Sequence, residues 1–340
     1  MSDRIDELLD RHARLTETIA PLVKTILVDA NIPFLAVAGR TKSRKSVEQK
    51  CKVKNYSNPE EELTDLSGIR VIVYVESDVA RAVSLIRSAF RVDEENSIDK
   101  DKLLSVREAG YRSVHLICDI GPDREALKEY SGLAALKFEI QVRTVLQHAW
   151  AELEHDKNYK FQEGLPEDMQ RQLYLHAGLL ELADRGLDRL SQEIDQYAES
   201  LREKAEKGDL SSKIDAVSVV QFVERWAAEH GAHLEEISHP ERMPDLLEEL
   251  DAFGIETLSD LNGIIPPGYA EQFPGSERER SGSNVFSVVR DWLLIKDAPK
   301  LAGCNWIVLP EDIEWLANFL PARDMEYIIA NFLMPEREDE

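Results

Sequence analysis

The segment Lys137–Lys160, KFEIQVRTVLQHAWAELEHDKNYK, constrains the fold more than any other part of the chain. Phe138, Ile140 and Val142 are apolar, and the residues between them are charged or polar. This period of two predicts a strand with one face on a hydrophobic core. The outward row consists of Lys137, Glu139, Gln141 and Arg143. A helix rich in His, Trp and Glu follows, so we expect the strand to form the floor of a cleft for phosphate and metal.

The remaining composition is that of a soluble globular protein. The 340 residues are enough for two domains, and 43% are hydrophobic and 31% charged. No apolar run approaches the ~20 residues needed to cross a membrane, and the N-terminal residues do not resemble a signal peptide. The three cysteines, Cys51, Cys118 and Cys304, have no disulfide or zinc spacing. We therefore expect a cytoplasmic protein with no membrane partner.

Charge is distributed unevenly along the chain. The net charge of −24 argues against general binding to nucleic-acid backbones, and residues 208–340 hold 27 acidic but only 10 basic residues. Arg40–Lys54, in contrast, holds seven cations and a single acid, Glu48. A glycine that ends a strand precedes this run, and we expect a helix to begin at Ser46. A helix N-terminus beside Arg40, Lys42 and Lys45 suits a phosphate chain, although a solvated basic face is the alternative.

The order of predicted elements defines two domains. Residues 1–207 are predicted to contain helices at 3–30, 46–54, 79–90 and 145–160, strands at 32–39, 65–75, 110–120 and 137–143, a polar loop at 94–104, and one or two long helices over 166–207. Pro21 is expected to divide the first helix. Residues 208–340 are predicted to be mostly helical, near 215–230, 242–253, 257–263, 284–295 and 311–333, with a loop at 266–283. The fold class is therefore α+β: a mixed sheet flanked by helices, followed by an acidic helical domain.

Two carboxylates are candidates for a magnesium site. Asp65 lies at the mouth of a predicted strand, and Glu139 lies on the outward face of another. Mg²⁺ prefers a few carboxylates together with water and substrate phosphates. Taken alone, Asp65 is better explained as a turn or helix cap.

Aromatic and histidine residues supply further candidates. Tyr111 and His115 share one strand face, where a tyrosine could stack on a nucleobase, although a half-buried pair at a sheet surface is as common. His148, Glu152, His155 and Tyr159 fall on one helix face, which favours zinc only weakly. We expect this helix to pack on the sheet, with Trp150 and Leu153 as anchors.

Four ordered motifs resemble the synthetase domain of the RelA/SpoT alarmone synthetases, particularly the small single-domain members. GRTKSRKSVEQK is similar to the basic phosphate loop of that family, and DLSGIRVIVY is similar to its metal-aspartate strand. GYRSVH resembles the guanine-binding strand, and EIQVRTVLQHAWAELEHDKNYK resembles the most characteristic signature. The resemblance covers residues 20–200 and does not extend to 210–340.

The resemblance implies a nucleotidyltransferase-like mixed sheet and a pyrophosphokinase that moves the β,γ-pyrophosphate of ATP to the ribose 3′-hydroxyl of GDP or GTP. By position, it assigns the ATP phosphates to Arg40, Lys42, Ser46 and Lys50, with a nucleotide contact from Arg70. It assigns Mg²⁺ to Asp65 and Glu139, and activation of the 3′-hydroxyl to Glu139. It assigns the acceptor nucleotide to Tyr111, His115, Gln141, Arg143 and His155.

Several alternatives remain open on the sequence. The acceptor could be the 3′-CCA end of tRNA or an adenosine nucleotide, as in toxic members of the family, because Tyr111 would stack on any base. A catalytically inactive nucleotide sensor is a further alternative. Residues 208–340 could mediate homo-oligomerisation, sense a partner or cover the basic cleft. The leucines of 166–207 are expected mostly to pack on their own domain, although a dimer or tetramer could also use them.

Overall fold

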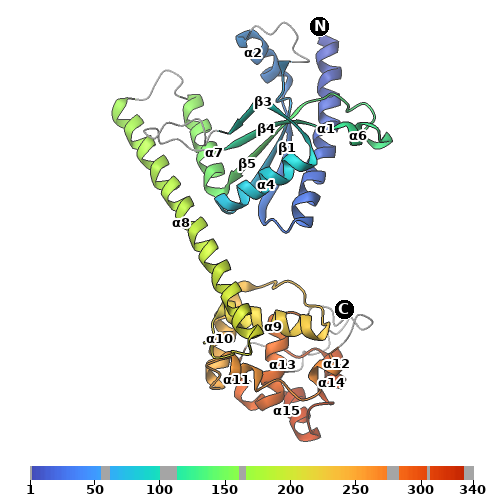
Figure 1. The fold of residues 1–340 in the computed structure, drawn as a ribbon, viewed down its shortest axis with the longest axis vertical. Coiled ribbons are helices and arrows are strands. Elements are labelled where there is room, and N and C mark those ends of the chain that lie inside the picture. Colours follow the sequence, from blue (N-terminus) through green and yellow to red (C-terminus); the bar gives the residue numbers. More distant parts are fainter. Residues whose placement is uncertain are drawn as a thin grey trace. The chain divides into compact units, whose positions relative to one another are not determined.

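The computed structural model describes residues 2–54, 62–99, 113–160, 166–273, 283–304 and 307–332. The chain divides into two compact units, Met1–Gln192 and Glu193–Glu340 (Figure 1). The long helix α8, Glu167–Glu206, contributes residues to both units. The boundary between domains at 207/208 stays a prediction, and it lies directly after the end of this helix. No helix in the described ranges is both long enough and apolar enough to span a membrane.

The first unit is built on a five-stranded mixed sheet with the order β1-β2-β5-β4-β3. The strands are β1 Phe34–Thr41, β2 Ser67–Val73, β3 Arg91–Asp99, β4 Val114–Asp119 and β5 Phe138–Thr144. Strands β2 and β5 are parallel, and the other neighbouring pairs are antiparallel. The predicted mixed sheet is therefore confirmed, and the Lys137 strand lies at its centre.

Helices α1 Ser2–Asp29 and α4 Glu76–Ala89 cover the sheet face to which the alternate apolar side chains of the strands point. The other helices of this unit are α2 Arg44–Lys54, α6 Pro122–Glu125, α7 Val145–Lys160 and the first part of α8, with a short 3₁₀ turn η1 at Lys128–Tyr130. Ile69 and Val71 of β2 share one buried cluster with Phe138 and Ile140 of β5. Apolar residues of α1 and α4, among them Leu15, complete this cluster. The other sheet face is thus left for polar side chains.

Three local predictions for this unit were wrong. Residues 94–99, predicted to be loop, belong to the strand β3. This strand lies at the edge of the described sheet, pairs with β4 and has an irregular register between Asp93 and Ile98. A polar edge strand of this kind lacks the alternation that marks a half-buried strand. Helix α1 continues through Pro21 as one helix. Helix α2 begins at Arg44, so Ser46 lies in its first turn.

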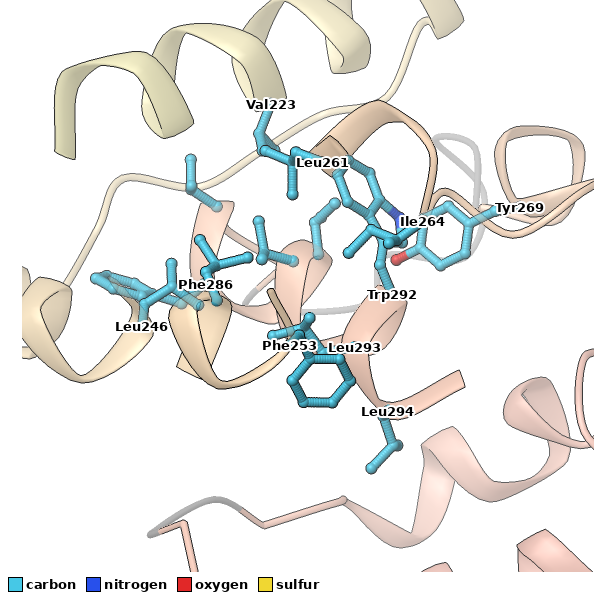
Figure 2. Close-up of a cluster of buried hydrophobic side chains, with 14 of the residues drawn as sticks. Val223, Leu246, Phe253, Leu261, Ile264, Tyr269, Phe286, Trp292, Leu293 and Leu294 are labelled. Carbon is cyan, nitrogen blue, oxygen red and sulfur yellow. The ribbon is translucent and has the colours of Figure 1, made fainter. Parts of the chain in front are cut away.

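The second unit is mostly helical, as predicted. Its helices after α8 are α9 Ala216–His230, α10 Met243–Ala252, α11 Leu258–Asn262, α12 Tyr269–Gln272, α13 Val285–Asp297, α14 Pro310–Leu316 and α15 Ala322–Phe332, with 3₁₀ turns η2 at Pro240–Arg242 and η3 at Ala298–Leu301. Figure 2 shows its core, in which the rings of Tyr269 and Trp292 lie 5.9 Å apart. The short helix α12 lies inside the segment predicted to be loop, because Tyr269 is fully buried and anchors it.

The core of the second unit also holds an ion pair. Arg290 donates from Nε and Nη2 to the two carboxylate oxygens of Glu249, at 2.7 and 2.6 Å. Both side chains are buried, with 5% and 7% exposed. A buried pair of this geometry satisfies charges that would otherwise be costly to remove from water.

Helix α8 does not bury its leucines as expected. Leu179, Leu182, Leu187 and Leu190 are all exposed, with Leu182 at 68%. The prediction that most of these leucines pack on their own domain was therefore wrong for these four. Asp184 and Asp188 of this helix accept hydrogen bonds from the sheet unit, and Ala177 is buried.

Candidate active site

The register of the sheet aligns the predicted site residues in two rows. Arg70 of β2 pairs with Gln141 of β5, which pairs with His115 of β4. Two residues earlier on β5, Glu139 pairs with Gly68 of β2, and Gly68 pairs with Arg40 of β1. Paired residues in a ladder point to the same face, and the alternate residues fill the core under α1 and α4. The two rows therefore line the face of the sheet opposite that core.

The basic segment closes onto Asp65. Lys42 and Lys50 donate from Nζ to Oδ2 of Asp65 at 2.6 and 2.7 Å. Burial raises the pKa of this carboxyl, but the hydrogen bonds and charges of the two lysines outweigh burial, so its pKa lies below the ordinary value. Oδ1 of Asp65 is buried and has no hydrogen-bond partner among the residues that the structure describes. One oxygen is thus bound by cations, and the other is left to accept a further ligand.

Glu139 is bound on both oxygens by residues of the neighbouring row. Oε1 lies 2.7 Å from Nδ1 of His115, and Oε2 accepts from Nε2 of Gln141 at 2.8 Å. Burial raises the pKa of Glu139, His115 and Gln141 lower it, and the negative charge of Asp65 raises it again; the net shift is downward. The two carboxylates are thus close enough to repel each other, and Glu139 is ionised at neutral pH.

Two guanidinium groups lie beyond the carboxylates on the same face. Arg143 is buried and donates from Nη2 to Oε1 of Gln141 at 2.6 Å. Its buried Nε has no hydrogen-bond partner in the described part of the chain. Burial and the nearby Arg70 both lower the pKa of Arg143. Arg70 donates from Nη1 to Oε1 of Glu152 on α7 at 2.6 Å. A donor without a partner, next to a second arginine, suits an anion such as phosphate.

The structure brings most of the predicted site residues together. Those gathered on this face or at its edge are Lys42, Lys50, Asp65, Arg70, His115, Glu139, Gln141 and Arg143. Arg40 is exposed on β1 in the row of Glu139, and the hydroxyl of Ser46 lies 2.9 Å from that of Ser43. Tyr111 lies outside the described residues. His155 lies on α7, but its side chain is also outside the described part.

The structure also shows contacts that the sequence did not indicate. His115 contacts Glu139 and, through Nε2, the hydroxyl of Ser113 at 2.7 Å. Glu152 pairs with Arg70. Trp150 is buried as expected, but Leu153 is 59% exposed and does not anchor α7. The hydrogen bond between Asp184 and Thr144 was also missed.

Asp65 and Glu139 fit a magnesium ion better than a zinc ion. Within the described ranges, no group of three or more His, Cys, Asp or Glu side chains is arranged to hold a metal. Mg²⁺ needs no such group, because water and substrate phosphates complete its shell. The buried Oδ1 of Asp65, to which no described residue donates, is the atom best suited to it.

Comparison with known proteins agrees with this geometry. Residues 39–164 match the family described as a region found in RelA/SpoT proteins. This RelA/SpoT region contains all four strand and loop segments that carry Asp65, Arg70, His115 and Glu139. The second unit lies entirely beyond it.

Individual relatives match about half of the chain. GTP pyrophosphokinase YjbM of Bacillus subtilis is 28% identical over 183 residues, which are 53% of this chain and 82% of the relative. GTP pyrophosphokinase YwaC of the same organism is 27% identical over 174 residues, which are 50% of this chain and 79% of the relative. The structure of a GTP pyrophosphokinase family protein from Streptococcus pneumoniae superimposes with a TM-score of 0.50 at 24% identity, covering 58% of this chain and 97% of that one. This last likeness shows a shared fold.

Proposed function

We propose that the RelA/SpoT region transfers pyrophosphate from ATP to the ribose 3′-hydroxyl of GDP or GTP. The hydroxyl oxygen forms a bond to the β-phosphorus of ATP, the bond between this phosphorus and the oxygen bridging to the α-phosphate breaks, and AMP leaves. The hydroxyl proton must be accepted at the same time. The products are AMP and a nucleotide with a 3′-diphosphate, ppGpp or pppGpp. Relatives named GTP pyrophosphokinases, which the chain covers over most of their length, support this proposal.

The observation that carries the proposal is that two carboxylates, each bound by its own partners, lie at one face of the sheet. Asp65 is bound by two lysines, and Glu139 is bound by His115 and Gln141 in the neighbouring row. Phosphoryl-type transfer depends mainly on alignment and charge neutralisation, so cations, one metal site and a carboxylate are sufficient. A site with these parts can hold a polyphosphate at one end and an acceptor hydroxyl at the other.

Each residue then has a position in the reaction. Lys42 and Lys50, with Arg40 and Ser46 nearby, bind the ATP phosphates, and Arg70 and Arg143 bind further phosphate oxygens. Glu139 is ionised, so it can accept a hydrogen bond or the proton from the 3′-hydroxyl. Gln141 and His115 orient its two oxygens. Tyr111 and His155 keep the acceptor roles that the family resemblance assigns to them.

Asp65 and Glu139 would hold Mg²⁺. When bound, the ion would neutralise charge on the phosphates of ATP. Lys42 and Lys50, which bind Asp65 in the ligand-free structure, would then be available to bind the phosphate oxygens. We expect activity to be lost on chelation by EDTA and restored by added Mg²⁺.

Two substitutions test the proposal. Asp65→Ala and Glu139→Ala should each abolish transfer and leave the fold intact, because each removes a charged group from the reacting centre. Asp119→Ala is the matched control. Like the two site carboxylates, Asp119 is shielded from solvent and bound by a partner, here Arg91, but it lies outside the site. Labelled ATP is incubated with GDP, GTP, an adenosine nucleotide or bulk tRNA, and AMP release is measured. Wild-type turnover in either site variant would contradict the assignment.

The same assay separates the other acceptors. Product formed on tRNA or on an adenosine nucleotide, with none on GDP or GTP, would replace the guanosine acceptor. A catalytically inactive nucleotide sensor would release no AMP with any of the acceptors tested. The acidic second unit, in which acids outnumber bases, does not favour tRNA.

A further inference from the structure

Helix α7 starts directly after Arg143 with a reciprocal cap. Thr144 donates from its backbone N–H to Oε1 of Gln147 at 3.0 Å, and the backbone N–H of Gln147 donates to Oγ1 of Thr144 at 3.1 Å. This is a capping box, in which each side chain binds the backbone of the other residue. Thr144 is fully buried and Gln147 is nearly so. The first turn of α7 is thus fixed at the end of the central strand.

A carboxylate from a distant helix completes this cap. Oδ2 of Asp184, on α8, accepts a hydrogen bond from the hydroxyl of Thr144 at 2.6 Å. Asp184 is only 1% exposed, and within the described ranges its Oδ1 has no hydrogen-bond partner. Burial raises the pKa of this carboxyl. A buried carboxyl group is costly unless it is hydrogen-bonded, so a single bond to Thr144 makes this contact sensitive to change.

The helix held by this cap carries two groups that face the arginines of the site. Glu152 binds Arg70 directly, and its negative charge also acts on Arg143. His148 lies close enough to feel the charges of both arginines. A shift of the first turn of α7 would move these groups and would also move the backbone of Arg143, which precedes the cap by one residue.

We propose that Asp184 is a positioning residue: through Thr144 it fixes the start of α7, and thereby places Arg143 and Arg70 to bind nucleotide phosphate. Asp184 itself touches no substrate. The inference rests on the proposed function only in the identity of the ligand, a nucleoside polyphosphate. The contact that carries it is independent of the reaction.

Asp188, one turn further along α8, provides a matched control. Its Oδ1 accepts the backbone N–H of Ser77 at 2.8 Å, at the start of α4. Helix α4 lies on the core side of the sheet, away from the polar face. Loss of either carboxylate removes one hydrogen bond between α8 and the same unit. Only loss of Asp184 releases the helix that faces the arginines.

The experiment compares four variants of this contact with the control Asp188→Ala. Asp184→Ala and Thr144→Val each break the contact from one side, whereas Asp184→Asn and Thr144→Ser keep an acceptor and a hydroxyl in place. For the first pair we expect the KM for ATP or GTP to rise about tenfold, the effect of one hydrogen bond to a charged group, with kcat changed much less. The second pair should stay within about threefold of the wild type, and so should Asp188→Ala.

Hydrogen exchange gives a readout that a general loss of stability would not reproduce. Amides of residues 145–152 should exchange faster in Asp184→Ala, and those of β2 should not. Equal kinetic effects of Asp184→Ala and Asp188→Ala, or failure of Asp184→Asn to restore KM, would overturn the proposal. If Asp184→Ala does not fold, Thr144→Val tests the same contact.

The two proposals can fail separately. If the wild type turns over no acceptor, the proposed function is wrong. The positioning role is then tested by calorimetric binding of a non-hydrolysable ATP analogue. About tenfold weaker binding to Asp184→Ala than to Asp188→Ala would support it, and equal binding would overturn it.

Discussion

Removal of the charge of Asp65 should destabilise the first unit because two lysines would then face each other. The nitrogens of Lys42 and Lys50 lie 2.6 and 2.7 Å from the same oxygen, so they can be no further apart than the sum of those distances. In the wild type the carboxylate lies between them. In Asp65→Asn the two ammonium groups retain their repulsion and lose the charge that offsets it.

The expected size follows from this geometry. Two unit charges at that greatest separation repel by about 1 kcal/mol in water and about 3 kcal/mol at an effective dielectric constant of 20. The lysine side chains are 25% and 31% exposed, so both can turn toward solvent. We therefore expect Asp65→Asn to lose about 1 kcal/mol of unfolding free energy, near the lower of these limits.

A second substitution distinguishes repulsion from simple loss of contacts. Lys50→Met added to Asp65→Asn removes one of the two facing charges, so the double variant should regain most of the lost stability while remaining inactive. In the wild-type background, Lys50→Met should instead be neutral or destabilising, because it removes a hydrogen bond to Asp65. The interaction between the two substitutions is therefore expected to be favourable.

The assay must report on the first unit alone. Four of the five tryptophans lie in the second unit, and only Trp150 lies in the first, so tryptophan fluorescence would follow the wrong unit. Calorimetry, together with hydrogen exchange in β2, separates the two. A double variant that is less stable than Asp65→Asn alone would refute the reasoning from like charges.

Two further predictions concern acid and the buried ion pair. Partners lower the pKa values of Asp65 and Glu139 below 3.8 and 4.5, so both stabilise the fold above those values and lose this effect as the pH falls further. Burial and the nearby Arg11 lower the pKa of His12 from 6.5 to about 4, so its contribution to stability falls as the pH drops through that interval; a pH series of calorimetric melts should show less loss there in His12→Asn. In the second unit, Arg290→Met should cost about 3–5 kcal/mol in urea denaturation followed by tryptophan fluorescence, because it leaves Glu249 buried without its partner. The exposed pair Arg225–Glu229 is the control, where Arg225→Met should cost about 0.5 kcal/mol; a cost below 1 kcal/mol for Arg290→Met would contradict the argument.

Much of the fold could be predicted because its signals are local. The alternation in β5 and the apolar spacing in α9 or α13 are each contained in one short segment, and the burial of Phe138, Ile140 and Val142 follows directly from it. The polar edge strand β3 could not be recognised in this way. Its pairing with β4 depends on a neighbour rather than on a pattern of its own.

The site was predictable as a set of residues but not as a set of contacts. Sequence motifs named Lys42, Lys50 and Asp65, yet only the fold shows that both lysines meet one oxygen. The bond from Asp184 to Thr144 joins residues that no local pattern connects. The Thr144–Gln147 cap, in contrast, was visible as a T-x-x-Q pattern at the start of a helix and could have been found.

The alternation of β5 separates two kinds of constraint along one strand. Its odd and even positions face different surroundings: Phe138, Ile140 and Val142 fill the core, while Glu139, Gln141 and Arg143 face the site. Substitutions at the first set should act on the amount of folded protein, and those at the second on its turnover. A one-residue insertion before the strand would exchange the two sets and remove both properties at once.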